Sequence, residues 1–307
     1  MAREFRPRDE RGFTLGEMMI AMALMLIMCG AITGALIQMT NTQRTIFNRT
    51  EMHSGVRGAT ELLQQEVGQA GRIALPTAVT LTAGVALGTQ SPTVTSSTGM
   101  FVGEQLVVGV SDKVETVTVT AVGTSPASFT ASFSQPHNSG DPVSAMGGFA
   151  YGIIPPSVTN GSTDWILKMF GDINGDGNMV YVEYKCDTAA GNLYRNSVTW
   201  TPSVTTKPTV GAAQVLLNNI TQNPGNAACF TYQTEPGGTW TFVTDVAITL
   251  TVQTQQIDAY TKGKQTETKA LLNVTPRNIF NVWQLAGQGI TSRIQALPTN
   301  VTTNLLP

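Results

Sequence analysis

The sequence predicts an α+β protein, in which a long N-terminal helix packs on an antiparallel β-sheet head and a small β-module is inserted between them. Three observations predict this: an uncharged apolar run near the N-terminus, a helical period after it, and Thr- and Val-rich alternation from residue 77 onward. Charged residues make up 12% of the chain, against about a quarter in typical soluble domains. Neutral polar side chains must therefore solvate much of the surface, as in many exported β-rich proteins.

Composition also argues against several functions. The net charge of −2 provides no basic field to attract nucleic acid, and we expect no nucleic-acid partner. Two histidines, His53 and His137, leave little material for a histidine-based metal or acid/base site. The sequence has no GxSxG, HExxH, Walker or Rossmann pattern, so we expect no enzymatic activity.

The N-terminal element begins with a charged, arginine-rich segment over residues 1–12. From Met18 to Ile37 no residue is charged, and about 20 residues are enough to span a bilayer as a helix. The arginines should keep the N-terminal end cytoplasmic. A cleaved secretory signal would have a shorter apolar core and a small-residue cleavage site after it. A plain signal anchor would not require Glu17, whose ionised carboxylate needs a partner near the bilayer.

The run from Arg11 to Glu17, RGFTLGE, resembles the class III signal of type IV prepilins and type II secretion pseudopilins. The resemblance implies that prepilin peptidase cuts after Gly12 and methylates the new N-terminal residue, Phe13. It also implies that Glu17 pairs with the α-amine of a neighbouring subunit in the filament. That pairing would compensate the buried charge and set the axial register.

The helix should continue past the membrane to about residue 72, because apolar or small residues recur at steps of mostly three or four as far as Ala70. Gly71 and Pro76 then offer a stop. A helix over 13–71 would be roughly 88 Å long at about 1.5 Å per residue. The end of this segment resembles PilW-like minor pilins in a set of matching residues: Leu62, Leu63, Glu66, Gln69, Ala70 and Gly71.

Residues 77–147 predict the inserted β-module. Apolar and polar residues alternate over 106–110, 114–122 and 128–133, with turn residues between these runs. His137 lies in the last of the turns. We expect it to stabilise the turn rather than bind a ligand.

Residues 148–287 predict the β-sheet head. Alternation predicts strands at Met179–Tyr184 and Val243–Val252. A turn at 262–264 should then lead to a partner strand at Thr268–Val274. The segment 273–283 resembles the strand end that contains "PRN" in PilW-like proteins. We expect the tail over 288–307 to be polar and loosely ordered. The large aromatic residues are expected in β segments, as core or sheet-face residues: Trp165, Tyr181, Tyr184, Trp200, Trp240 and Trp283.

One segment of the head, GDINGDGNMVYVEY at 171–184, fits the calcium-loop pattern. Gly177 would permit the sharp turn, although Val180 supplies no side-chain oxygen and the flanks read as strands. A tight hairpin turn is the alternative, because Asn-Gly and Asp-Gly favour such turns. The candidate calcium ligands are oxygen donors spaced along the loop: Asp172, Asn174, Asp176, the Asn178 carbonyl and Glu183.

The three cysteines differ in their surroundings. Cys29 lies in the apolar run, whereas Cys186 and Cys229 stand apart in a polar, Thr-rich region. These two are either unpaired thiols or, if the head is exported to an oxidising compartment, a disulfide. Such a bridge would close a loop of about 43 residues and stabilise the fold by roughly 3–4 kcal/mol.

The resemblance implies a structural minor pilin of a type IV pilus, which primes or caps the filament and serves assembly, motility or adhesion. The alternatives are a minor pseudopilin of a type II secretion system, or an adhesin that presents 77–147 from the filament. The implied partners are prepilin peptidase, other major and minor pilins, and the inner membrane. Before assembly the chain would cross that membrane once, with its head in the periplasm, and it would then reach the cell surface in the pilus.

Overall fold

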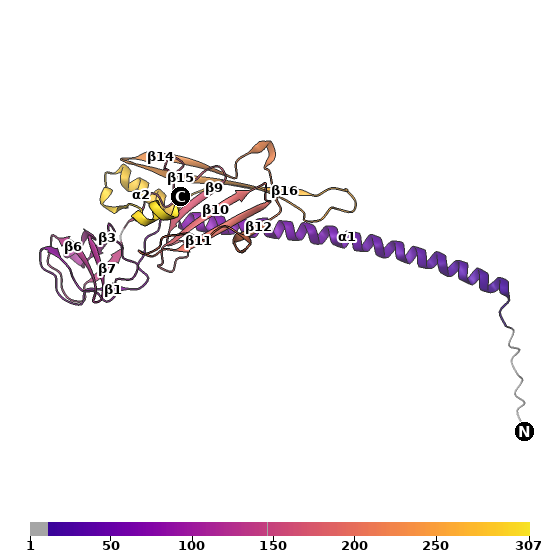
Figure 1. Cartoon of the computed structure of the whole chain (residues 1–307), viewed down its shortest axis with the longest axis horizontal. Helices are drawn as coiled ribbons and strands as arrows, with labels where there is room; N and C mark the ends of the chain where they lie inside the picture. Colours follow the sequence, from indigo (N-terminus) through magenta and orange to yellow (C-terminus); the bar gives the residue numbers. More distant parts are fainter. Residues whose placement is uncertain (1–11, 146) are drawn as a thin grey trace, which may run out of the picture.

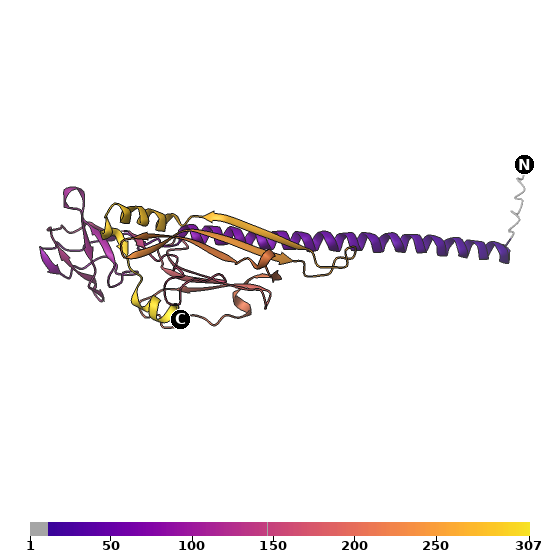
Figure 2. The same cartoon turned by 90° about the horizontal axis from the view of Figure 1, so that it is seen from above.

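The computed structural model describes residues 12–145 and 147–307 and confirms the α+β architecture. A long helix, α1 (Leu15–Gln69), extends from one end, and its C-terminal part packs on the β-sheet head (Figure 1). The β-module lies at the opposite end of the molecule from the N-terminus (Figure 1). Figure 2 shows α1 in line with the strands of the head, so the whole chain is organised along one axis.

Helix α1 begins and ends for identifiable reasons. Thr14 is the N-cap and forms a capping box with Glu17. In the second half of the helix, apolar side chains at steps of three and four are buried against the head: Met52, Val56, Ala59, Leu63 and Val67. The helix ends before Gly71, whose φ of +81° and close approach to Ile279 leave no room for a Cβ atom.

The β-module has two small sheets that face one core. The strand orders are β1-β7-β3-β4 and β2-β6-β5. The core contains residues from both sheets, among them Leu106, Val108 and Phe129. The predicted run 114–122 is divided between β4 and β5 rather than forming one strand. The strand bounds are β1 (Val79–Thr80), β2 (Gly88–Gln90), β3 (Gln105–Val108), β4 (Glu115–Thr118), β5 (Ala121–Thr124), β6 (Ala127–Phe133) and β7 (Pro142–Ala145).

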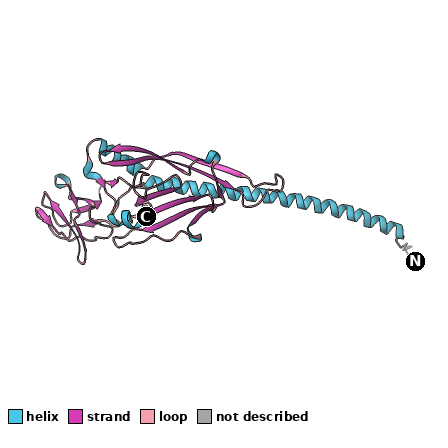
Figure 3. Ribbon diagram, turned by 45° about the horizontal axis from the view of Figure 1, so that its top comes forward, coloured by secondary structure: helices cyan, strands magenta, loops and turns pink. Residues whose placement is uncertain are grey.

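The head consists of two antiparallel sheets packed around α1 (Figure 3). The first has the order β12-β11-β10-β9. In the second, β15 pairs with β13 and β14 and also with β16. The strand bounds are β9 (Ile166–Gly171), β10 (Val180–Asp187), β11 (Asn192–Thr199), β12 (Val215–Asn218), β13 (Ile220–Thr221), β14 (Phe230–Gly237), β15 (Trp240–Gln253) and β16 (Thr266–Val274).

The central strand of the second sheet confirms the predicted pattern. On β15, alternate residues are almost fully buried: Val246, Ile248, Leu250 and Val252. Its partner β16 pairs antiparallel across the predicted turn. One apolar core joins α1, both sheets and helix α2 (Arg277–Gly287), so the C-terminal part of α1 is an integral part of the head.

The C-terminal region differs from the expectation. The "PRN" segment follows β16 and starts helix α2, and Trp283 therefore lies on a helix rather than a strand. Trp165 and Trp200 lie just outside β9 and β11. Amphipathic spacing in the sequence of α2 accounts for the helix, because its buried residues Ile279 and Val282 are three positions apart.

The tail is also better ordered than predicted. Strand β17 (Ile294–Gln295) pairs in parallel with β8 (Gly148–Phe149), and a final helical turn covers Val301–Leu305. Leu306 is buried, and its carbonyl accepts a hydrogen bond from Lys168 Nζ at 2.5 Å. A few apolar residues are enough to bury the tail. The average composition of the segment is polar, so it did not indicate this burial. Short 3-10 turns complete the fold at Ser111–Lys113, Ala212–Gln214, Pro224–Asn226 and Thr291–Arg293.

Candidate functional site

The predicted cleavage point lies directly in front of α1. Gly12 and Phe13 precede the N-cap and are not helical, and Phe13 is 84% exposed. A Cβ atom on Gly12 would meet nothing within 4 Å. Packing within the chain therefore does not require glycine here. The remainder of the predicted leader, residues 1–11, lies outside the described residues.

Glu17 lies in the first turn of α1, four residues after Phe13. Its Oε2 accepts hydrogen bonds from the Thr14 amide at 2.9 Å and the Thr14 hydroxyl at 3.0 Å. The Glu17 amide donates in turn to the Thr14 hydroxyl at 3.3 Å. The carboxylate is thus fixed at the positive end of the helix dipole, close to Phe13.

The N-terminal half of α1 exposes an unbroken apolar surface. Apolar side chains over this part of α1 are more than half exposed, among them Ile20, Leu26 and Ile32. Among the described residues, α1 is the one helix long and apolar enough to cross a membrane. The second half of the same helix packs on the head, whereas this apolar surface has no partner within the described chain. An apolar surface of this kind requires either lipid or other apolar helices around it.

The 171–184 segment forms a hairpin. Asp172 Oδ1 accepts a hydrogen bond from the Asp176 amide at 2.9 Å, and Asp176 Oδ1 accepts one from the Asn178 amide at the same distance. Asn174 lies in the exposed tip of the turn. A Cβ atom on Gly177 would come within 2.4 Å of Pro76, so glycine is required by close packing as well as by its φ of +83°.

Glu183 lies further along β10 and has other partners. Lys207 Nζ and the Tyr181 hydroxyl each donate to its Oε2 at 2.8 Å, and Lys168 Nζ lies 3.8 Å away. Burial lowers the pKa of the Lys168 ammonium, although Glu183 opposes this. Glu183 is therefore engaged by other residues and does not join Asp172 and Asp176 as a candidate calcium ligand. Within 12–145 and 147–307, no three acidic, histidine or cysteine side chains form a group that could hold a metal.

Cys186 and Cys229 form a disulfide, which is the pairing expected if the head lies in an oxidising compartment. Cys186 is in β10, and Cys229 directly precedes β14. The bridge therefore joins the two sheets of the head across a sequence separation of 43 residues. Cys29 is free and exposed on the apolar half of α1.

A buried ion pair holds α1 to the first sheet. The Glu66 carboxylate accepts hydrogen bonds from Arg195 Nε, at 3.0 Å for Oε1, and from the Tyr184 hydroxyl at 2.5 Å. Glu66 is 4% exposed. In the sequence, Glu66 was notable solely through the resemblance to PilW-like proteins. Glu66 lies between Leu63 and Val67 on the buried stripe of the helix. A carboxylate in such a position needs a partner, and this was the signal in the sequence that could have identified the ion pair.

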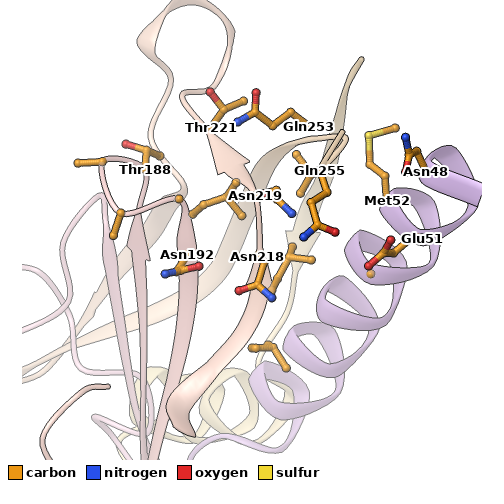
Figure 4. A pocket seen from close by; sticks show the side chains of 18 residues that line it. Asn48, Glu51, Met52, Thr188, Asn192, Asn218, Asn219, Thr221, Gln253 and Gln255 are labelled. Carbon is orange, nitrogen blue, oxygen red and sulfur yellow. The ribbon is translucent and has the colours of Figure 1, made fainter. Parts of the chain in front are cut away.

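An open cleft of about 680 Å³ lies at the base of the head, where α1 meets the β10–β11 turn, β12, β13 and the end of β15 (Figure 4). Glu51 is the one ionisable side chain among the described residues that line it. About half of the others are neutral and polar, including Asn48, Asn218, Asn219 and Gln255. The cleft can therefore offer hydrogen bonds, but it brings together no pair of acid and base.

Comparison with known families adds one match. The model of the prokaryotic N-terminal methylation motif matches residues 7–33, which include Gly12, Phe13 and Glu17. No curated protein and no solved structure matches significantly. The motif and the exposed apolar helix together support a type IV pilin or pseudopilin-type protein, which is anchored in a membrane before assembly. The motif also implies processing by prepilin peptidase and assembly with other pilins.

Proposed function

We propose that the protein is a structural minor pilin of a type IV pilus, of the PilW-like kind, that primes or caps the filament. Prepilin peptidase removes the leader after Gly12, and the freed Phe13 amine and Glu17 then link neighbouring subunits. The observation that carries this proposal is the position of Glu17, at the N-terminus of an exposed apolar helix and within the methylation motif. We propose a structural role and no enzymatic activity.

A position at the end of the filament is supported by the β-module. It extends the head beyond the C-terminal end of α1, along the axis of the helix (Figure 1). In a filament whose helices run roughly parallel to its axis, the module would occupy the space of the next subunit. A few copies at an end accommodate this feature more easily than many copies along the shaft.

Two further candidates share this fold. A minor pseudopilin of a type II secretion system would use the same helix and processing motif. An adhesin would use the β-module, whose exposed residues include Leu87, Val102 and Val110. The disulfide between the two sheets supports a periplasmic head in all three cases.

The test is the location of the mature protein in the native host. We expect it to co-purify with sheared pili, in amounts far below those of the major subunit, and to be required for normal numbers of pili. Its absence from sheared pili, together with loss of protein secretion on deletion, would contradict the pilus assignment and favour the pseudopilin.

Calcium binding by the hairpin stays a separate proposal, now without Glu183 and limited to Asp172, Asn174, Asp176 and the Asn178 carbonyl. It is supported by Asp172 Oδ2, which is buried and forms no hydrogen bond. However, Arg72 Nε lies 3.5 Å from that oxygen and already balances its charge. Calcium, but not magnesium, should raise the melting temperature of the protein and should not raise that of Asp176→Asn. An unchanged melting temperature of the protein on addition of calcium would contradict the calcium site.

A further inference from the structure

The loop between β15 and β16, residues 254–265, extends from the head along α1 toward the apolar half of the helix (Figure 1). We call this loop the strap. The Thr42 hydroxyl lies 2.9 Å from the Tyr260 hydroxyl, and the Thr45 hydroxyl donates to Asp258 Oδ2 at 2.8 Å. Because Thr42 and Thr45 are three residues apart, the strap follows one face of the helix.

Internal hydrogen bonds fix the shape of the strap. Asp258 Oδ1 accepts from the amides of Tyr260 at 2.9 Å and Thr261 at 2.8 Å, while Oδ2 also accepts from Gln265 Nε2 at 3.1 Å. At the base of the strap, the Thr254 amide donates to the Gln265 carbonyl at 2.8 Å. Asp258 is 4% exposed. The side chains on the outside of the strap are therefore held in place relative to α1.

Those outer side chains include large apolar groups. Ile257 is 64% exposed and Tyr260 is 56% exposed. At the same height on α1, Ile46 and Phe47 are also more than half exposed. Apolar groups of this size are not explained by packing within the chain.

The strap lies at a defined height above the apolar run. The Tyr260 hydroxyl is 3.4 Å from the Gln38 carbonyl, and Gln38 follows the last apolar residue of the run, Ile37. At about 1.5 Å per residue, Thr42 is about 8 Å beyond Ile37. The headgroup region of a bilayer is about that thick on each side of the hydrocarbon core. If the run spans the core, Tyr260, which contacts Gln38 and Thr42, lies within the headgroup region.

The charges around the strap favour phosphate groups. Lys262 and Lys264 on the strap are exposed, as are Arg44 and Arg49 on α1. The sequence has no acidic residue between positions 38 and 50, and the acid of the strap, Asp258, is buried in hydrogen bonds. The exposed charge at this height is therefore positive.

We propose that the strap and the adjoining turns of α1 form a second membrane-binding surface, which docks on anionic phospholipid headgroups. Tyr260 and Ile257 pack among the headgroups, and Lys262 and Lys264 bind lipid phosphates. This inference rests on the insertion of α1 that the proposed function assumes. Before the subunit is assembled, docking fixes the height of the head above the bilayer and its rotation about the axis of α1.

The experiment uses the full-length protein in vesicles of phosphatidylcholine and phosphatidylglycerol, with nitroxide labels on free thiols. The native Cys29 reports on the span. In a Cys29→Ser background, Ile257→Cys reports on the strap, and Leu87→Cys is the control on the distal module, with similar exposure. Spin-label accessibility to oxygen and to a water-soluble nickel chelate then measures depth. We expect a several-fold higher oxygen-to-nickel ratio at 257 than at 87.

The outcomes separate the two claims. A label at Cys29 that is accessible to nickel would overturn membrane insertion, and with it the proposed function. A label at Cys29 in the bilayer, with equal ratios at 257 and 87, would overturn the strap inference alone. Spin–spin broadening at 257 would assign the surface to a second copy of the chain and would also overturn it.

The lipid charge is tested in the same samples. Omitting phosphatidylglycerol should lower the oxygen-to-nickel ratio at 257, and the double variant Lys262→Gln/Lys264→Gln should lower it to a similar extent in the mixed vesicles. The ratio at Cys29 should stay unchanged in both cases. An unchanged ratio at 257 would overturn the role of anionic headgroups.

Discussion

In the proposed assembly, Glu17 interacts with one partner in the free subunit and with a second in the filament. In the free subunit its carboxylate accepts hydrogen bonds from the Thr14 amide and hydroxyl. An amine from a neighbouring subunit can approach the same carboxylate, because the first turn of α1 is exposed. An acid that is already fixed in place loses little conformational freedom when that amine arrives.

Glu17→Ala should therefore leave cleavage largely intact but strongly reduce incorporation into filaments. The reason is that an apolar helix can still enter the membrane, whereas the Phe13 amine has no anionic partner in the assembly. Immunoblots of cell and sheared-filament fractions measure both steps. Glu61→Ala is the matched control, since Glu61 is exposed on the same helix and pairs with Arg57. Normal incorporation of Glu17→Ala would refute the proposed pairing.

Gly12→Leu should block processing. Because the structure has free space around Gly12, the leucine would cost the folded chain nothing, and a loss of cleavage would report on recognition by the peptidase. Gly16→Leu is the control, because Gly16 also has free space around it but lies beyond the cleaved bond. The mass of the protein in membrane extracts decides the result. Efficient cleavage of Gly12→Leu would contradict the predicted cleavage site.

A residue pattern in the sequence was informative where a single chemical requirement explains the identity and spacing of its residues. The spacing of Gly12, Phe13 and Glu17 specified a processing motif, which the family comparison supports. The calcium pattern was less specific, because turn formation and close packing on Pro76 explain the same glycine and aspartate residues. The contacts of Glu183 with Lys168 and Lys207 join residues far apart in sequence and could not be predicted from spacing.

At the scale of elements, strongly periodic segments were predictable. The alternation on β15 and the helical stripe of α1 each reflect burial of a single face. Helix α2 and the tail were not predicted, because each buries a few apolar residues in a mostly polar sequence. The strap was expected as a simple turn, since its contacts with Thr42 and Thr45 depend on tertiary structure.

The β-module should be stabilised by Glu115 in a pH-dependent way. Burial alone would raise the pKa of Glu115, but hydrogen bonds from Ser134, His137 and Gln135 outweigh it and lower the pKa below the usual 4.5. A carboxyl group with a lowered folded-state pKa stabilises the fold above its unfolded pKa. That contribution is lost as the pH falls through the folded value.

Glu115→Gln should therefore lower the melting temperature of the protein near neutral pH, and by a smaller amount below about pH 4. Thermal unfolding of both proteins across this range gives the difference directly. A difference that stays constant with pH would contradict the assigned role of Glu115.

At the scale of the whole molecule, the β-module leaves the head and returns to it at neighbouring points. Arg72 forms a β-bridge with Gly148, and the Phe149 amide donates to the Gly71 carbonyl at 2.9 Å. The module also packs on the head through Phe101, whose ring lies 5.4 Å from that of Trp200. An insertion with adjacent ends can be removed without separating α1 from the sheets.

Replacing residues 77–147 with a short flexible linker should leave processing and incorporation intact, at some loss of thermal stability because the Trp200 ring becomes exposed. Sheared-filament blots and an attachment assay report the two properties separately. Retained pili with lost attachment would favour the adhesin. Failure to incorporate would contradict the view that the module is separable from the assembly helix.

The central claim is that the mature chain starts at Phe13, with its amine placed one helical turn before Glu17. Intact mass and N-terminal peptide mass spectrometry of the protein from native filaments measure this most directly. The account predicts that residues 1–12 are absent and that the chain starts with N-methylated Phe13. A retained leader, or a mature chain that starts at any other residue, would contradict it.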